Sequence, residues 1–141
     1  MYHLLSQQLD NELEDCVTLT GFVPDEELCE HYRLCDLFVL PSKLEGFGIV
    51  YLEAMACGKP VVGGNQDGAV DALDHGNLGI LVDPDDVAIL SQTLIEMFEE
   101  KELDTSISES KEIREKMINL FGPANFQLRL AENLKNVGIS P

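Results

Sequence analysis

Two glutamates separated by eight positions, Glu45 and Glu53, flank a glycine-bearing stretch at 46–50. This stretch predicts a loop that opens into a short apolar helix, with Glu45 in the loop and Glu53 about two turns into the helix. Eight residues are close to two turns of about 3.6 residues each, so we expect Glu53 to point back along the face that Glu45 overhangs. Carboxylates at such a rim are well placed to accept hydrogen bonds from sugar hydroxyls.

Free backbone amides are the second chemical feature of this stretch. The residues at the expected helix entrance are Gly46, Phe47, Gly48, Ile49 and Val50. The first amides of a helix have no intrahelical acceptor, and the helix dipole places partial positive charge beside them, so the entrance is a natural phosphate site. The two glycines would let a ligand approach the backbone closely. Phe47 also has a simpler interpretation as a core aromatic residue.

The elements that must position this site are expected to alternate between strands and helices. Strands are predicted at 17–20, 37–40, 60–62 and 79–82, with helices beginning after Pro24, Gly48 and Asp83 and a short helix at 68–73. Continuous apolar runs are typical of parallel strands covered on both faces. The alternation predicts an α/β fold, a Rossmann-like parallel sheet with flanking helices. A helical C-terminal tail is predicted over about 106–137, interrupted at Gly122.

Composition excludes several classes of partner. The net charge of −17 argues against nucleic-acid binding and against docking on anionic lipid, and any phosphate site must rely on backbone amides and a few local cations. No apolar run reaches the length of about 18 residues that a membrane span needs. Residues 1–15 contain acids but no Lys or Arg, which is unlike a signal peptide, so we expect a cytoplasmic protein.

The chain contains four cysteines, whose spacing bears on metal binding and on disulfide formation. They are Cys16, Cys29, Cys35 and Cys57, without CxxC spacing or local histidine partners. This pattern predicts no metal site and favours free, mostly buried thiols.

In their order and spacing, these residues resemble the donor site of the retaining glycosyltransferases of family 4, the glycosyl transferases group 1, which have the GT-B fold. The resemblance runs from Leu13 to about Phe98 and takes in the segments 20–24, 35–42, 45–53, 58–62 and 79–84. It implies that 1–141 is a single partial GT-B C-terminal domain, truncated at its N-terminal side, with a donor-binding core at about 13–98 and C-terminal helices at about 106–137.

The resemblance also implies roles for individual residues. Glu45 matches the glutamate that contacts the donor sugar near the reacting carbon, and it is the candidate catalytic residue. Glu53 matches the glutamate that accepts hydrogen bonds from the ribose hydroxyls. The amides within 46–50 would face the diphosphate, and the backbone at Val23 and Pro24 would border the nucleotide base.

Two departures from the family pattern bear on these roles. The loop at 67–71 carries Asp67 and Asp71 where many members have a glycine and a glutamate, and we expect Asp71 to cap its short helix or brace the loop. The Arg and Lys that neutralise the leaving diphosphate in the family lie further upstream, and 1–15 contains neither. The nearest cations are Arg33, Lys43 and Lys59, none of them at a matching position.

The resemblance therefore implies the donor-binding part of an enzyme that transfers a sugar from a nucleotide-diphosphate sugar to an acceptor hydroxyl, with no metal or other cofactor. The missing half would come from a separate chain, or the chain would pair with a second copy through an open sheet edge or its last helix. The alternative is a non-catalytic, truncated nucleotide-binding or interaction module that lacks the Arg/Lys pair and the acceptor domain. A nucleotide-sugar epimerase is a third option that the glutamate pairing fits less well. The side chains of this sequence do not identify the donor sugar, the nucleotide base or the acceptor.

Overall fold

A three-stranded parallel sheet forms the centre of the protein. Its strands are β1 (Phe38–Leu40), β2 (Val61–Gly64) and β3 (Ile80–Val82), in the order β1-β2-β3. Val61 lies opposite Phe38, and Val62 lies opposite Ile80. All four residues of β2 are buried, because a central parallel strand has neighbours on both edges and helices on its faces. The structure thus confirms the predicted α/β fold with a parallel sheet.

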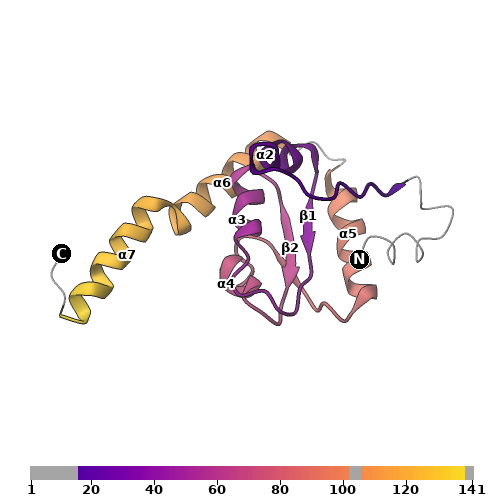
Figure 1. Cartoon of the computed structure of the whole chain (residues 1–141). Coiled ribbons are helices and arrows are strands. Elements are labelled where there is room, and N and C mark those ends of the chain that lie inside the picture. Colours follow the sequence, from indigo (N-terminus) through magenta and orange to yellow (C-terminus); the bar gives the residue numbers. More distant parts are fainter. Residues whose placement is uncertain (1–15, 102–105, 139–141) are drawn as a thin grey trace.

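Helices surround this sheet and then lead away from it (Figure 1). The computed structural model describes residues 16–101 and 106–138. Its helices are α2 (Asp25–Leu34), α3 (Ile49–Ala56), α4 (Ala69–Ala72), the 3-10 helix η2 (Asp74–Gly76), α5 (Val87–Lys101), α6 (Ser106–Phe121) and α7 (Pro123–Asn136). In Figure 1, α7 continues from α6 away from the sheet, so the predicted helical tail is present.

Local sequence signals explain where several helices begin. Asp86 Oδ1 accepts a hydrogen bond of 2.9 Å from the Ile89 amide, which caps the first turn of α5. Gly122 precedes α7, and Pro123 stands in its first turn, where a missing amide hydrogen costs nothing. These boundaries agree with the sequence-based expectation.

The strand predicted at 17–20 is not formed. This segment has no regular secondary structure, and Val17 and Leu19 are exposed. A strand is stable only when a neighbour accepts and donates its backbone hydrogen bonds. Within the described residues β1 pairs with β2 alone, and no described strand pairs with the 17–20 segment, so its β-favouring residues have nothing to pair with.

The core lies between β2 and the helices α3, α4 and α6. Tyr51, Met55 and Leu73 are fully buried, and Met117 of α6 joins them. Arg114 of α6 donates a hydrogen bond of 2.6 Å to the carbonyl at the end of α3, Ala56 O. This packing fixes α3, the helix that carries the predicted site.

The last helix has a different environment. Three apolar side chains of α7 and the one that directly follows it are exposed: Phe126, Leu128, Leu130 and Val137.

Across the described parts of the chain, none of the helices has the length and apolar character needed to cross a membrane. Residues 1–15, on which the expectation about a signal peptide rests, lie outside the described residues.

Candidate functional site

The loop that contains Glu45 is tied to the next loop of the sheet. Glu45 follows β1, and Asp67 follows β2, so both lie at the carboxyl end of the parallel strands. The Glu45 amide donates to Asp67 Oδ2 at 2.8 Å, and the Gly68 amide donates to the Glu45 carbonyl at 2.9 Å. The two hydrogen bonds hold Glu45 in a fixed place beside the entrance of α3.

The Asp67 carboxylate joins the loop after β1 to the start of α4. Its Oδ1 accepts from the Ala69 amide at 3.0 Å, at the start of α4. Partial desolvation by itself raises the pKa of Asp67, but hydrogen bonds from the Glu45 and Ala69 amides and from Ser42 outweigh it, and the pKa lies below its ordinary value. The bracing role expected of Asp71 therefore belongs to Asp67, whose side chain faces the neighbouring loop, whereas Asp71 is exposed on α4.

Two glycines allow the loops to approach so closely. Gly48, just before α3, has a left-handed backbone with φ of +86°, and a Cβ there would overlap the Tyr51 ring. A Cβ at Gly68 would overlap the Gly46 carbonyl and would lie 2.7 Å from the Phe47 amide nitrogen. The backbone of the two loops thus leaves no room for a side chain at either position.

The predicted helix entrance carries the amides at 47–50. Among the described residues, none of these four amides has a hydrogen-bond acceptor. The Gly46 amide donates to its neighbour Glu45 Oε1 at 3.1 Å. The Phe47 ring packs edge-on against Phe121 of α6, with centroids 5.7 Å apart, so Phe47 is a half-buried aromatic residue that packs against the core. Ile49 and Val50 form the first turn of α3, with Ile49 exposed.

Tyr51 is a structural residue of the site that sequence reasoning missed. It is fully buried, and its hydroxyl donates to the Leu40 carbonyl at 2.6 Å. Burial, followed by the negative charges of Asp67 and Glu45, raises the pKa of Tyr51 to about 12. A tyrosine in the first turn of a mostly apolar helix was the available signal, because a buried phenol needs an acceptor.

Glu53 lies in a separate setting between α2 and α3. Its Oε2 accepts a hydrogen bond of 2.8 Å from the Tyr32 hydroxyl. Both residues line a pocket of about 250 Å³, together with Asp25, Leu28, Cys29 and Cys57. Burial, and then the hydrogen bond and charge of Glu53, raise the pKa of Tyr32 well above its usual range. The phenol therefore stays protonated and keeps donating to Glu53.

The two glutamates are held by different elements: the side chain of Glu53 by α2, and the backbone of Glu45 by the loop after β2. The ring of Tyr32 packs edge-on against Phe38, the first residue of β1, with centroids 5.6 Å apart. The Tyr32 hydroxyl thus directs Glu53 toward α2, while Glu45 stands in the loop after β1, at the carboxyl end of the sheet. The orientation of Glu53 is a tertiary effect, because the hydroxyl that holds it comes from another helix.

The segment at Val23 and Pro24 leads directly into the Glu53 pocket. Pro24 is extended, with φ of −62°, and its carbonyl accepts from the Leu28 amide at 3.1 Å as α2 begins. The next residue, Asp25, lines the same pocket as Glu53. The structure therefore brings the predicted base-bordering segment close to the predicted ribose-binding residue.

The three cations that lie nearest to the site in sequence, Arg33, Lys43 and Lys59, are already engaged. Lys43 forms an ion pair with Asp85, at the carboxyl end of the sheet. Arg33 pairs with Glu30 at 2.7 Å, and Lys59 donates to the Arg33 carbonyl at 2.8 Å. In the part of the chain that the structure describes, no three His, Cys, Asp or Glu side chains gather as a metal site would require.

The expectation of mostly buried thiols is wrong. Cys16 and Cys29 are exposed, and Cys35 and Cys57 are half-buried. The prediction treated cysteine as a small apolar residue, but α2 turns Cys29 toward the surface and Cys57 stands at the end of α3.

Comparison with known families gives a match over most of the chain. The family described as glycosyl transferases group 1 matches residues 2–114.

Curated relatives are similar over a shorter stretch. A GDP-mannose-dependent alpha-(1-6)-phosphatidylinositol monomannoside mannosyltransferase of Mycobacterium tuberculosis is 38% identical over 95 residues, which cover 62% of this chain and 25% of the relative. A mannosylfructose-phosphate synthase of Agrobacterium fabrum is 41% identical, covering 64% and 20%. A D-inositol 3-phosphate glycosyltransferase of Thermobispora bispora is 38% identical, covering 68% and 22%. The chain thus spans a quarter or less of these relatives.

A solved structure matches more of the chain. Anabaena HepE in complex with UDP-glucose is 28% identical with a TM-score of 0.74, covering 96% of this chain and 36% of HepE. The complex of HepE with UDP gives a TM-score of 0.76 over the same shares. The likeness extends over the sheet and the helices described above.

Proposed function

Because this chain belongs to the glycosyl transferases group 1 family, we propose that it is the donor-binding part of a retaining glycosyltransferase of the family 4 type. The reaction moves a sugar from a nucleotide-diphosphate sugar to an acceptor hydroxyl, with the diphosphate leaving from the face that the acceptor attacks. We further propose that it needs no metal and that it works in the cytoplasm.

The diphosphate would lie at the entrance of α3. The observation that carries the proposal is the set of amides at 47–50, which have no acceptor among the described residues and which the glycine-dependent loops hold at the carboxyl end of a parallel sheet. Ligands of open parallel sheets bind at that end, and a helix N-terminus attracts anions. In a chain with a net charge of −17 these directed amides offset the unfavourable overall field.

Glu53 would hold the ribose. Its Oε2 accepts from Tyr32, and its other oxygen, which no described residue contacts by a hydrogen bond, would accept from a ribose hydroxyl. Hydrogen bonds to a carboxylate contribute about 1.5–3 kcal/mol each. Tyr32 is then a positioning residue, because it orients a carboxylate that touches the ligand. The neighbouring backbone at Val23 and Pro24 would border the base.

Glu45 would contact the donor sugar. Its backbone is fixed by Asp67 and Gly68, so the carboxylate stands near the place where the anomeric carbon would lie, next to the diphosphate. A negative charge at that point would stabilise positive character on the carbon as the diphosphate leaves. This role makes Glu45 the catalytic residue of the proposal.

An alternative is a module that binds the nucleotide without transferring sugar. The observation in its favour is that the three cations nearest the site in sequence are engaged with Asp85, Glu30 and a backbone carbonyl. A leaving diphosphate needs positive charge, so transfer would require further cations that these three residues do not supply. Sugar transfer by this chain alone would exclude the alternative.

Calorimetric titration with UDP, GDP and ADP tests the proposal. We expect one nucleotide to bind, and we expect Glu53→Ala to lower its affinity by at least about 10-fold, since one charged hydrogen bond is lost. Glu115→Ala is the matched control, because Glu115 is an exposed glutamate on α6. Repeating the titration with EDTA tests the absence of a metal.

Two results would overturn the proposal. One is a folded chain that binds none of the three nucleotides. The other is a nucleotide whose affinity is the same in Glu53→Ala and in the wild type. An affinity that collapses in EDTA would contradict only the metal-free part.

A further inference from the structure

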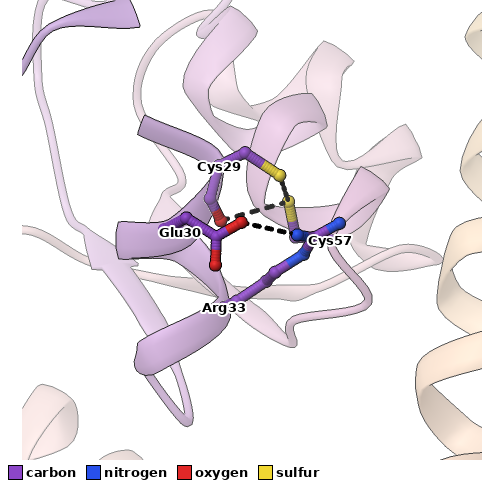
Figure 2. A network of polar contacts seen from close by, with 4 residues as sticks. All are labelled: Cys29, Glu30, Arg33 and Cys57. Atoms are coloured by element: carbon purple, nitrogen blue, oxygen red, sulfur yellow. Dashed lines mark hydrogen bonds and ion pairs between the residues drawn. The ribbon is translucent and has the colours of Figure 1, made fainter. Parts of the chain in front are cut away.

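Two cysteine sulfurs face each other across the junction of α2 and α3. The Sγ atoms of Cys29 and Cys57 are 3.6 Å apart, although the residues are 28 positions apart in sequence. Figure 2 shows the two side chains directed toward one another, with Arg33 and Glu30 beside them. Cys29 is exposed and Cys57 is half-buried. A disulfide needs a sulfur–sulfur distance of about 2.05 Å, so the sulfurs would have to approach by roughly 1.5 Å.

The pair adjoins the proposed ribose site on both helices. Cys29 lies one turn before Tyr32 on α2, and Cys57, directly after the end of α3, lies one turn after Glu53. All four side chains line the same pocket of about 250 Å³. Residues one turn apart on a helix are neighbours on its surface. A covalent link at the cysteines would therefore act directly on the wall that holds the Tyr32–Glu53 hydrogen bond.

We propose that Cys29 and Cys57 form a reversible disulfide that joins α2 to α3 and changes the Glu53 pocket. The disulfide itself is independent of the proposed function, whereas its effect on nucleotide binding rests on it.

The oxidant is a peroxide. The Cys29 thiolate attacks one oxygen of hydrogen peroxide, the O–O bond breaks, and the released hydroxide takes up a proton to become water. Cys57 then attacks the sulfur of the Cys29 sulfenic acid, the S–S bond forms, and the second oxygen leaves as water with the thiol proton. The two sulfurs lose two electrons in total, and the peroxide gains them. A thiol reductant reverses the step by thiol–disulfide exchange.

The surroundings assign the two roles. Cys29 is open to solvent, so a peroxide can reach its sulfur directly. Burial, and then the hydrogen bond to Cys29, raise the pKa of Cys57. Cys29 is thus the attacking thiol, and Cys57 is the one that resolves the sulfenic acid.

The test is a thiol count and a peptide map after graded treatment with hydrogen peroxide. We expect the free thiols to fall from four per chain to two, with a linked peptide that contains Cys29 and Cys57 and disappears with dithiothreitol. Cys29→Ser should abolish the linked peptide, and Cys16→Ser, at the other exposed cysteine, should leave it unchanged. The oxidised chain should also unfold at a higher temperature, because the link restricts the unfolded state.

A chain whose cysteines become sulfinic acids without a Cys29–Cys57 peptide would overturn the disulfide. Titration of the reduced and oxidised chains with the nucleotide found above tests the second part, where equal affinity overturns the effect on the pocket. If neither form binds a nucleotide, the proposed function fails, while the peptide map still decides the disulfide.

Discussion

The two glutamates of the proposed donor site are held by different kinds of interaction. Glu45 is fixed through its backbone, by the Asp67 carboxylate and the Gly68 amide. Glu53 is fixed through its side chain, by the hydroxyl of Tyr32 from another helix. The first region depends on close approach of backbone, so small steric changes should disrupt it strongly. The second depends on helix packing and a single hydroxyl, so its changes should be milder and more specific to binding.

The largest expected effect tests the backbone dependence of the Glu45 region. In Gly68→Ala the new Cβ overlaps the Gly46 carbonyl, which cannot move without breaking the loop pairing. We expect a loss of stability of about 1–3 kcal/mol or more in urea denaturation. Gly46→Ala is the control, since a Cβ there meets nothing within 4 Å. Equal stability of the two variants would show that the loops are not held as described.

The next effect concerns the carboxylate that joins the two loops. Asp67→Asn should cost about 1–3 kcal/mol at neutral pH, because the ionised group accepts from two amides. The folded pKa of Asp67 lies below its ordinary value, so this stabilisation is present above about pH 4 and is lost as the pH falls through the folded pKa. The difference in unfolding free energy between wild type and variant should therefore shrink at acid pH. A difference that is constant between neutral and acid pH, or as large for Asp71→Asn, would contradict the assignment.

A smaller effect tests the Glu53 region. Tyr32→Phe removes only the hydroxyl that orients Glu53, and we expect nucleotide affinity to fall roughly 2- to 10-fold with a loss of stability of about 0.5–1.5 kcal/mol. Tyr51→Phe is the matched change in the other region, where the hydroxyl donates to a carbonyl. Tyr51→Phe should lower stability but leave the contribution of Glu53 to nucleotide binding unchanged. That contribution is measured by introducing Glu53→Ala into the wild type and into each tyrosine variant and comparing the losses of affinity. A Tyr32→Phe chain with wild-type affinity would remove Tyr32 from the site.

The smallest effect on stability is expected for substitutions in α7, outside both glutamate regions. These substitutions should instead change the self-association of the chain. We propose that the exposed apolar side chains of α7 mediate pairing with a second copy. Phe126→Ser with Leu130→Ser should lower the sedimentation coefficient at micromolar concentration while changing stability by no more than about 0.5 kcal/mol. Gln127→Ser, on the same helix, is the control. A wild-type chain that sediments as a single monomer would refute the pairing.

Much of the fold follows from local patterns. The apolar runs predicted β1, β2 and β3, and Pro24, Gly48 and Asp83 marked where the helices α2, α3 and α5 follow. The segment at 17–20 shows where this reasoning fails, because its residues favour a strand but strand formation depends on a neighbour. Pattern describes what a segment prefers, and pairing decides whether the preference is realised.

The candidate site divides in the same way. Residue types and spacing identified Glu45, Glu53 and the helix entrance at 46–50 as the chemically interesting stretch. They did not identify Asp67 as the brace, Tyr32 as the partner of Glu53, or the pairing of Cys29 with Cys57. Each of these contacts joins residues more than 20 positions apart, beyond the reach of any local periodicity.

By itself the sequence determined the alternation of elements, the acidic charge and the position of a glycine-bordered helix entrance, because backbone preference and charge belong to individual residues. Only the tertiary structure decided which way each glutamate points and which thiols meet. Those outcomes depend on distances between separate elements, and such distances arise when the helices pack on the sheet.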